Sequence, residues 1–369
     1  MAYSIEENSS MAEDKKEAEK IARCAMCADM CKYSCPTYLA TGRETLSPQK
    51  MARLIVYDEK GLLADEEGFL DLMFQSAMCG ACSKHCIYDD YDLRKFIHQA
   101  RVKAFARGVI PEDVRKRVET FRKFGNPNGE RELIDKRAGD TGYFISCSSY
   151  KDEGLLKATE RMLSKSGLAV RRFGGGDICC GAPLYYAGDV EGFKQASLKM
   201  KAEIEKRRVR RIVVDCPTCM KMMTDAYREI GTELDAEIMH TVQFIHSLLG
   251  QGRFGFKIDN RMVTFHDPCI LSYDLAMSAI PRQIIAALGF NLKEPVYSGE
   301  HTHCCGAAYG AKIGDHRLKD AVTSMRTNEL RDTAADIYVT ACPTCKSVLS
   351  EINMKYITEL VAERIIAGR

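Results

Sequence analysis

The sequence predicts an α/β protein in which a mostly helical N-terminal domain precedes two repeated α/β units with parallel strands. The first observation behind this prediction is a set of five cysteines that recurs in the same order. The two copies read Cys147-x31-Cys179-Cys180-x35-Cys216-x2-Cys219 and Cys269-x34-Cys304-Cys305-x36-Cys342-x2-Cys345. The second observation is that short β-branched runs end at a cysteine in both copies, with helical patterns after them. Such runs are typical of buried parallel strands.

The composition is that of an ordinary globular protein. The 369 residues allow two or three domains, and 46% of them are hydrophobic and 28% charged. A net charge of +2 gives no reason to expect a nucleic acid or an acidic membrane surface as partner. No apolar run approaches the roughly 20 residues that span a bilayer, and the N-terminus lacks the regions of a signal peptide. We therefore expect a cytoplasmic protein, peripheral to a membrane only through a partner.

Seventeen cysteines are far more than a cytoplasmic protein normally carries. A reducing compartment argues against structural disulfides, and the odd number of cysteines argues the same way. Every cysteine falls into one of four groups with regular spacing, and none is left over. This complete partition predicts metal or redox chemistry.

Changes in composition divide the chain into five parts. A polar and charged extension precedes two cysteine groups, which we assign to a ferredoxin-like iron–sulfur domain. A connector follows, in which a helix starts near Pro111 and a loop rich in Gly, Asn and Pro spans 125–129. The expected boundaries are 1–20 for the extension, 21–107 for the ferredoxin-like domain, 108–138 for the helical connector, 139–255 for the first α/β unit and 256–369 for the second.

The cysteine groups of the N-terminal domain are Cys24-x2-Cys27-x3-Cys31-x3-Cys35-Pro36 and Cys79-x2-Cys82-x3-Cys86. Four cysteines closed by a proline resemble the run of bacterial ferredoxins, in which three thiolates hold one cubane and the fourth reaches the other. Between the groups, Ser47 and Pro48 predict the start of a helix. The alternative is a zinc module, because paired CxxC motifs also bind zinc. The proline after Cys35 and the presence of a partner run favour iron–sulfur clusters.

The second group lacks one cysteine, and it can be aligned with the ferredoxin run in two ways. If Cys79 is the first ligand, the missing fourth ligand falls at Asp90, and if Cys86 is the fourth, the missing first falls at Ser76. We favour Ser76, because that run keeps every usual interval. A complete [4Fe–4S] cubane is then held by Cys24, Cys27, Cys31 and Cys86. An under-ligated cluster, either [3Fe–4S] or a cubane with an oxygen ligand, is held by Cys35, Cys79 and Cys82. In the Asp90 alignment, the cluster that lacks a cysteine ligand is the other one.

Each repeated unit supplies five thiolates, one more than a tetrahedral zinc site or a simple cubane uses. The adjacent pair Cys179-Cys180 cannot easily aim both sulfurs at one ion, whereas a cluster can take each thiolate on a different iron or let one bridge. Open α/β sheets carry their sites at the carboxyl ends of the strands, where these cysteines are expected. The spacing thus predicts a multinuclear, thiolate-rich iron–sulfur site in each unit.

Two copies of this motif after a ferredoxin-like region resemble the CCG-domain family. The family includes the B and D subunits of heterodisulfide reductase, and iron–sulfur subunits of glycolate oxidase, lactate utilisation systems and anaerobic glycerol-3-phosphate dehydrogenase. Local sequence such as His266-Asp267-Pro268-Cys269 agrees with this resemblance. Two departures, Tyr273 and Tyr309, are expected to reshape the substrate pocket.

The resemblance implies one noncubane [4Fe–4S] cluster in each unit. The implied ligands are Cys147, Cys179, Cys180, Cys216 and Cys219 in the first unit, and Cys269, Cys304, Cys305, Cys342 and Cys345 in the second. In heterodisulfide reductases, the disulfide of coenzyme M and coenzyme B is split between two such clusters. By this resemblance the paired cysteines Cys179, Cys180, Cys304 and Cys305 act at the catalytic centre as cluster ligands.

Two functions follow as expectations. In the first, the chain is an oxidoreductase subunit that passes electrons from ferredoxin-like clusters to the paired clusters, which reduce a disulfide. In the second, it only relays electrons between a flavoprotein, such as an electron-transfer flavoprotein or an FAD dehydrogenase, and a membrane or soluble acceptor. Either function needs partner subunits, because flavin, nicotinamide and membrane motifs are absent from the sequence. Near the clusters, His266, His301 and His303 either tune the site or bond locally to fix their loops.

Overall fold

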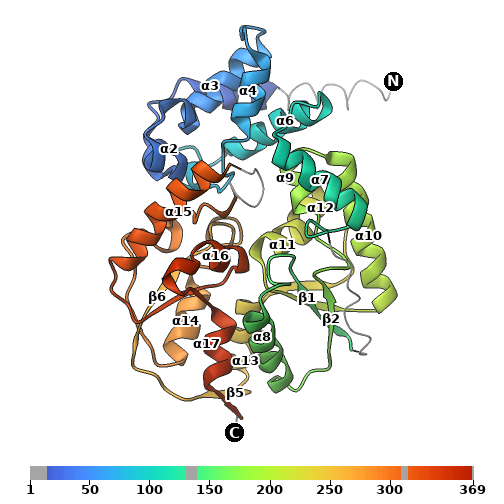
Figure 1. Cartoon of the computed structure of the whole chain (residues 1–369), viewed down its shortest axis with the longest axis vertical. Coiled ribbons are helices and arrows are strands. Elements are labelled where there is room, and N and C mark those ends of the chain that lie inside the picture. The colour runs from blue at the N-terminus through green and yellow to red at the C-terminus, as the bar shows by residue number, and fades with distance from the viewer. Residues whose placement is uncertain (1–14, 130–138, 309–314, 368–369) are drawn as a thin grey trace.

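The computed structural model describes residues 15–129, 139–308 and 315–367, and it has the predicted α/β architecture. A helical domain lies at one end of the molecule, and two α/β units lie side by side beneath it (Figure 1). Among the described residues, no helix combines the length and the apolar character needed to cross a membrane.

The N-terminal domain is built from short helices around the two cysteine groups. A helix over 15–25 enters the first group. The predicted helix starts at Pro48, but the Ser47 hydroxyl donates to Asp29 Oδ2 at 2.7 Å instead of capping the helix. The elements are η1 (Met30–Ser34), α2 (Pro36–Thr41), η2 (Glu44–Leu46), α3 (Pro48–Glu59), α4 (Glu66–Met73), α5 (Ala81–Lys84) and α6 (Leu93–Ala106).

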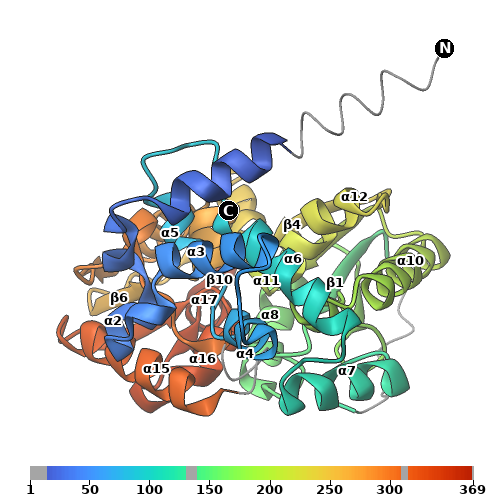
Figure 2. The ribbon, with the colours of Figure 1, turned by 90° about the horizontal axis from the view of Figure 1, so that it is seen from above.

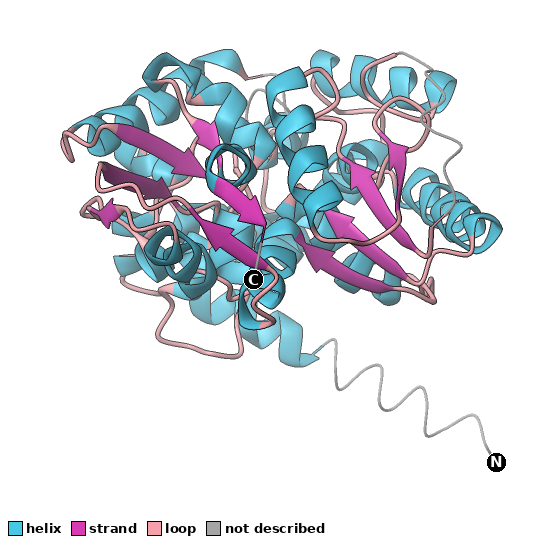
Figure 3. Ribbon diagram, turned by 90° about the horizontal axis from the view of Figure 1, so that it is seen from below, coloured by secondary structure: helices cyan, strands magenta, loops and turns pink. Residues whose placement is uncertain are grey.

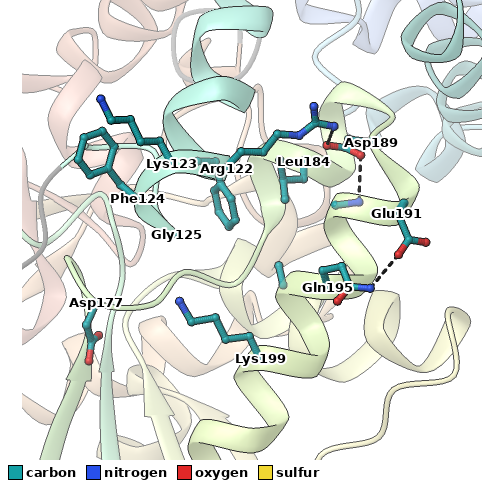
Figure 4. Close-up of a pocket in the computed structure, with 13 residues that line it drawn as sticks. Arg122, Lys123, Phe124, Gly125, Asp177, Leu184, Asp189, Glu191, Gln195 and Lys199 are labelled. Carbon is teal, nitrogen blue, oxygen red and sulfur yellow. Dashed lines mark hydrogen bonds and ion pairs between the residues drawn. The ribbon is translucent and has the colours of Figure 1, made fainter.

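The connector contains α7 (Glu112–Phe124), which begins after Pro111 as predicted. Gly125 ends this helix with a φ of 78°, a conformation that glycine adopts readily. Figure 4 shows Arg122 of this helix reaching Asp189, and the two side chains form an ion pair of 2.8 Å. The remainder of the connector, 130–138, lies outside the described residues.

The first unit is a parallel sheet of four strands in the order β2-β1-β3-β4. Its strands are β1 (Thr141–Ile145), β2 (Val170–Gly174), β3 (Arg211–Val214) and β4 (Glu237–His240). Its helical elements are α8 (Glu153–Lys165), α9 (Ala182–Ala187), α10 (Val190–Arg207), α11 (Pro217–Lys221), η3 (Met222–Ala226), α12 (Tyr227–Glu229) and α13 (Thr241–Gly250).

The second unit repeats this topology as β7-β6-β8-β9, again with parallel pairing. Its strands are β6 (Met262–His266), β7 (Asn291–Leu292), β8 (Ile337–Thr340) and β9 (Lys355–Tyr356). Its helical elements are η4 (Ile270–Asp274), α14 (Ala279–Ala287), η5 (Gly299–His301), α15 (His316–Arg331), α16 (Pro343–Val348), η7 (Ser350–Ile352) and α17 (Ile357–Arg364). A separate antiparallel pair joins β5 (Phe254–Phe256) to β10 (Ile365–Ala367).

The two units pack against each other through reciprocal contacts. The helix after β9, α17, packs on α8, which follows β1, and α13 after β4 packs in the same way on α14 after β6. Such exchange of equivalent elements is the pattern of a two-fold relation. The two sheets therefore stand beside each other (Figure 3), with equivalent edges turned toward the same interface.

The N-terminal domain covers both units from above (Figure 2). On the second unit α2 packs against α15, and on the first unit α6 packs against α9. Arg101 of α6 is fully buried between domains, and its guanidinium donates to the carbonyls of Met73 and Tyr186. This seating brings the N-terminal cysteines next to the strand ends of the repeats.

Candidate metal centres

The repeated cysteines lie at the carboxyl ends of the central strands, as the parallel topology requires. Cys147 and Cys216 follow β1 and β3 by two residues, and Cys342 follows β8 by two. Cys269 follows β6 by three. Cys216 and Cys342 are also the N-terminal caps of α11 and α16, whose exposed N–H groups favour a thiolate.

The paired cysteines are followed by glycines that the backbone needs at these positions. Gly181 has a φ of +78° and Gly306 a φ of +83°. A Cβ at Gly181 would lie 2.9 Å from Phe193 Cδ2, and one at Gly306 would lie 3.0 Å from the Lys319 carbonyl oxygen. A side chain at either position would strain the turn and displace the preceding cysteines.

One cavity of about 410 Å³ collects the cysteines of both units. Its lining includes one cysteine of the N-terminal domain and nine of the ten repeat cysteines, all but Cys179: Cys79, Cys147, Cys180, Cys216, Cys219, Cys269, Cys304, Cys305, Cys342 and Cys345. A larger cavity of about 880 Å³ lies between α7 and α10, and no described residue that lines it is a cysteine. The smaller cavity therefore gathers the candidate cluster ligands of the repeats.

Within each unit, contacts between thiols join the five cysteines in the same order. In the first unit this order is Cys147, Cys179, Cys180, Cys219, Cys216. In the second unit it is Cys269, Cys304, Cys305, Cys345, Cys342, with Cys305 Sγ and Cys345 Sγ 3.1 Å apart. A further contact joins Cys216 to Cys342, so the ten thiols form one continuous chain across the interface.

The donor set fits iron–sulfur clusters. All 17 cysteines are free, and eight of the ten in the repeats are buried. Contacts with Cys179 and Cys219 lower the pKa of Cys180, and contacts with Cys304 and Cys345 lower the pKa of Cys305. Buried thiolates at this density repel one another unless cations lie among them, and the irons of a cluster supply that charge.

The N-terminal cysteines line two small cavities, which share Cys82. One small cavity is lined by Cys24, Cys27, Cys31, Cys82 and Cys86. A second is lined by Cys35, Cys79, Cys82 and Ser76. Burial raises the pKa of the Cys35 and Cys79 thiols, so ionised sulfur in this cavity needs a metal.

The structure distinguishes the two candidates for the missing ligand by their positions. Ser76 lies in the same cavity as Cys35 and Cys79, and its Oγ accepts a hydrogen bond from the Met78 N–H at 3.2 Å. The Asp90 side chain is about half exposed and forms an ion pair with Arg23 at 3.0 Å. Of these two residues, only Ser76 shares a cavity with Cys35, Cys79 and Cys82.

Cys79 connects the N-terminal domain to the second unit. It lines both the cavity with Ser76 and the central cavity, and burial and the nearby Cys269 thiol raise its pKa. The two cysteines come from different domains. The incomplete N-terminal group therefore borders the second repeat.

Several residues near the centres had no sequence signal, because their partners are distant in the chain. The Arg94 guanidinium bonds Asp92 and reaches Asp274 at 2.6 Å, 180 positions away. The Asp215 carboxylate, next to Cys216, accepts from Ser149 and Tyr143, and burial raises its pKa to about 6. Arg117 and Lys151 bring positive charge to the central cavity.

The histidines and tyrosines singled out in the sequence differ in their surroundings. His266 is buried beside Arg326, whereas His301 stacks on His85 across the domain interface. His303 Nδ1 lies 2.6 Å from Glu329. The Tyr273 hydroxyl donates to the Thr302 carbonyl, and burial and the nearby thiols of Cys79, Cys269 and Cys304 raise its pKa. Tyr273 is not among the described residues that line the central cavity, so its effect on this pocket stays a prediction. Tyr309 lies outside the described residues.

Comparisons with known proteins agree with this architecture. A cysteine-rich domain family, CCG, matches residues 141–224 and 263–350, and a 4Fe-4S dicluster domain family matches 20–89. The chain is 28% identical over 93% of its length to the D subunit of the dihydromethanophenazine:CoB–CoM heterodisulfide reductase of Methanosarcina barkeri, covering 91% of that protein. It is 22% identical over 79% of its length to the EtfAB:quinone oxidoreductase of Syntrophomonas wolfei, covering 45% of that protein.

A structural comparison supports the fold alone. A hypothetical protein from Helicobacter pylori superimposes with a TM-score of 0.55 and 11% identity, covering 85% of this chain and 68% of that protein. The repeated cysteine motif at the strand ends, the dicluster domain and these matches lead to one conclusion. The chain belongs to the CCG-domain iron–sulfur proteins.

Proposed function

We propose that this chain is the iron–sulfur electron-transfer subunit of an oxidoreductase complex resembling heterodisulfide reductase, and that it reduces a disulfide in the central cavity. The observation that carries the proposal is the single cavity lined by the thiols of both units. Bound clusters supply one-electron chemistry, and two of them facing one cavity suit a two-electron cleavage. The relative from Methanosarcina barkeri spans nearly the same length as this chain and supports this assignment.

In this proposal all 17 cysteines are cluster ligands. The five-cysteine sets of units 139–255 and 256–369 each hold a noncubane [4Fe–4S] cluster. In the domain 21–107, Cys24, Cys27, Cys31 and Cys86 hold a cubane, and Cys35, Cys79 and Cys82 hold the incomplete cluster beside Ser76. The shared cavities of these residues support the assignment.

Two basic side chains border the central cavity beside the sulfur ligands. Arg117 and Lys151 line it, and none of its described lining residues is a carboxylate. Asn128 fixes the loop beside Lys151 by donating from its side chain to the Cys147 carbonyl at 2.9 Å. We propose a small disulfide or thiol as the substrate. The thiol-rich sequence fits a reducing cytoplasm.

The proposal is tested by EPR on the anaerobically reconstituted full chain, with and without an anionic thiol such as coenzyme M. A new cluster-centred signal that depends on the thiol is expected, together with more than about ten iron atoms per chain. Spectra that ignore the thiol would instead indicate the second candidate, an electron relay without its own substrate. That candidate is favoured by the likeness to an EtfAB:quinone oxidoreductase.

Ser76 provides a test of the incomplete cluster. Replacing Ser76 by cysteine supplies the missing ligand, so the oxidised protein is expected to gain about one iron atom if the native cluster is [3Fe–4S]. Its paramagnetic [3Fe–4S] signal should then disappear. Asp90→Cys is the matched control, and it should change neither iron content nor the EPR spectrum. An effect of Asp90→Cys equal to that of Ser76→Cys contradicts the ligand assignment.

The partner that delivers or receives electrons is proposed to dock around the first cubane. Apolar side chains next to its ligands face solvent: Met26 is 81% exposed, Met30 68% and Ile87 83%. Large apolar side chains at this exposure are typical of interaction sites. A flavoprotein subunit or a cytochrome-bearing membrane subunit would approach here.

Replacing Met26 and Ile87 by glutamate is expected to slow electron exchange with the partner about tenfold or more, because interface anchors contribute on the order of 1–2 kcal/mol each. The rate is measured by stopped-flow absorbance with the partner protein, at unchanged iron content. Val296→Glu, at a site 88% exposed in the second unit, is the control and should leave the rate unchanged. If the unaltered chain, the Met26 and Ile87 variant and the Val296→Glu control exchange electrons at equal rates, the docking site lies elsewhere.

A further inference from the structure

The two repeated units differ at one buried position next to the sulfur ligands. In the ladders, His266 pairs with Thr340 and Phe144 pairs with Val214. Cys342 and Cys216 each follow these partners by two residues. His266 and Phe144 therefore occupy equivalent positions, so the second unit has an imidazole where the first has a phenyl ring.

The protonation of His266 follows from its neighbour. Arg326 is fully buried, and its Nε–H donates to His266 Nδ1 at 3.1 Å. An arginine N–H can only donate, so Nδ1 is an acceptor and the neutral ring carries its proton on Nε2. Arg326 is itself held by Glu329 at 2.7 Å and by the Tyr297 carbonyl at 2.9 Å. These buried contacts hold His266 in the tautomer that carries its proton on Nε2.

The His266 imidazole lies beside two proposed cluster ligands of the second unit. His266, Cys305 and Cys345 each present one ligand atom, and these atoms lie within 4.8 Å of one another. His266 Nε2 is buried and has no nitrogen or oxygen partner among the described residues, and the His266 side chain contacts Cys305. A buried N–H without a partner is costly, and sulfur that carries negative charge would satisfy it.

The first unit has a different environment around the equivalent ligands. Asp215 immediately precedes Cys216, and Ala341 takes the equivalent position in the second unit. The buried histidine of the first unit, His240, uses both nitrogens on the backbone. Its Nδ1 accepts from the Val242 N–H at 3.3 Å, so its Nε2–H donates to the Asp215 carbonyl at 3.3 Å. His240 thus has no N–H left for sulfur.

We propose that His266 donates a hydrogen bond from Nε2–H to the thiolates of Cys305 and Cys345, and that this bond makes the cluster of the second unit the easier of the two to reduce. A hydrogen bond to a ligand sulfur draws negative charge from the cluster and raises its reduction potential. Arg326 is the positioning residue, because it acts only through the tautomer of His266. Since Cys79 borders the second unit, the cluster reduced first is also the one that lies beside Cys79. The inference rests on the proposed cluster assignment.

The test is a redox titration of the reconstituted full chain followed by EPR, with signals assigned through Cys147→Ser and Cys269→Ser. His266→Phe introduces the side chain found at the equivalent position of the first unit, Phe144. It should lower the midpoint reduction potential of the second unit's cluster. At the original midpoint, the ratio of reduced to oxidised cluster should fall at least tenfold, equivalent to about 59 mV for one electron. His266→Gln keeps an N–H near the position of Nε2 and should restore most of the potential. The control His240→Asn should leave the second unit's signal unmoved.

An unmoved midpoint in His266→Phe, an equal shift in His240→Asn, or earlier reduction of the first unit in the unaltered protein overturns the inference. If His266→Phe does not assemble its clusters, ENDOR of the unaltered protein with ¹⁵N-histidine answers the same question. An exchangeable proton coupled to the second unit's cluster is expected, and a strong nitrogen coupling would show iron ligation instead. Loss of both signals from the unaltered protein, with low iron, would count against the proposed function itself.

Discussion

Replacing Cys180 by alanine is expected to remove the cluster of the first unit, with a loss of about four iron atoms per chain. Cys180 is the central member of its thiol chain, in contact with Cys179 on one side and Cys219 on the other. Without the Cys180 thiol, the chain of five thiols is broken between Cys179 and Cys219. Metal analysis and EPR check the result, and the signal of the second unit should persist.

Disulfide reduction by this variant should fall by more than about 100-fold. Loss of an outer-shell partner of a metal ligand costs about 10–100-fold in metal affinity or activity, and loss of the ligand itself costs more. Ser148→Ala is the matched control, because Ser148 lines the same cavity and bonds Thr344 at 2.9 Å but offers no thiolate. A Cys180→Ala protein with full iron content and activity would exclude the five-cysteine assignment.

Replacing Arg94 by methionine is expected to lower the free energy of unfolding by about 3 kcal/mol. Arg94 contacts Asp274 at 2.6 Å, and the Asp274 side chain is only 7% exposed. Its guanidinium also packs over Gly80, where an added Cβ would lie 2.8 Å from Nη1. Removing one partner leaves a buried charge less compensated, although Lys221 still reaches Asp274 at 3.0 Å.

Thermal unfolding of the loaded protein measures this effect, and a double-mutant cycle with Asp274→Asn isolates the pair. The control is Lys157→Met, which breaks an exposed ion pair with Glu153 within one helix. It should lower the free energy of unfolding by no more than about 0.5 kcal/mol. Because Gly80 lies beside Cys79, the Arg94 variant should also disturb the junction between the N-terminal domain and the second unit. Similar melting temperatures for the two variants would show that this junction does not depend on Arg94.

Much of the fold could be predicted from local patterns. The β-branched runs that end near Cys147, Cys216, Cys269 and Cys342 are the central strands β1, β3, β6 and β8. Pro48 and Pro111 marked helix starts correctly, because proline restricts the backbone in any context. Ser47 was predicted as a helix cap, but its hydroxyl bonds Asp29, 18 positions away. A tertiary partner displaced the local one.

The cysteine pattern by itself determined the family and the two-unit repeat, because ligand spacing and strand periodicity are local properties of the chain. Only the tertiary structure decided which thiols meet. The reciprocal packing of α17 on α8 and of α13 on α14 turns both sets of strand ends toward one cavity. The folded structure also places Ser76 beside Cys35, Cys79 beside Cys269, and Arg326 against His266. These contacts join residues that are distant in sequence, so no local pattern could predict them, and the contact of Cys79 with Cys269 also needs the N-terminal domain to pack on the second unit.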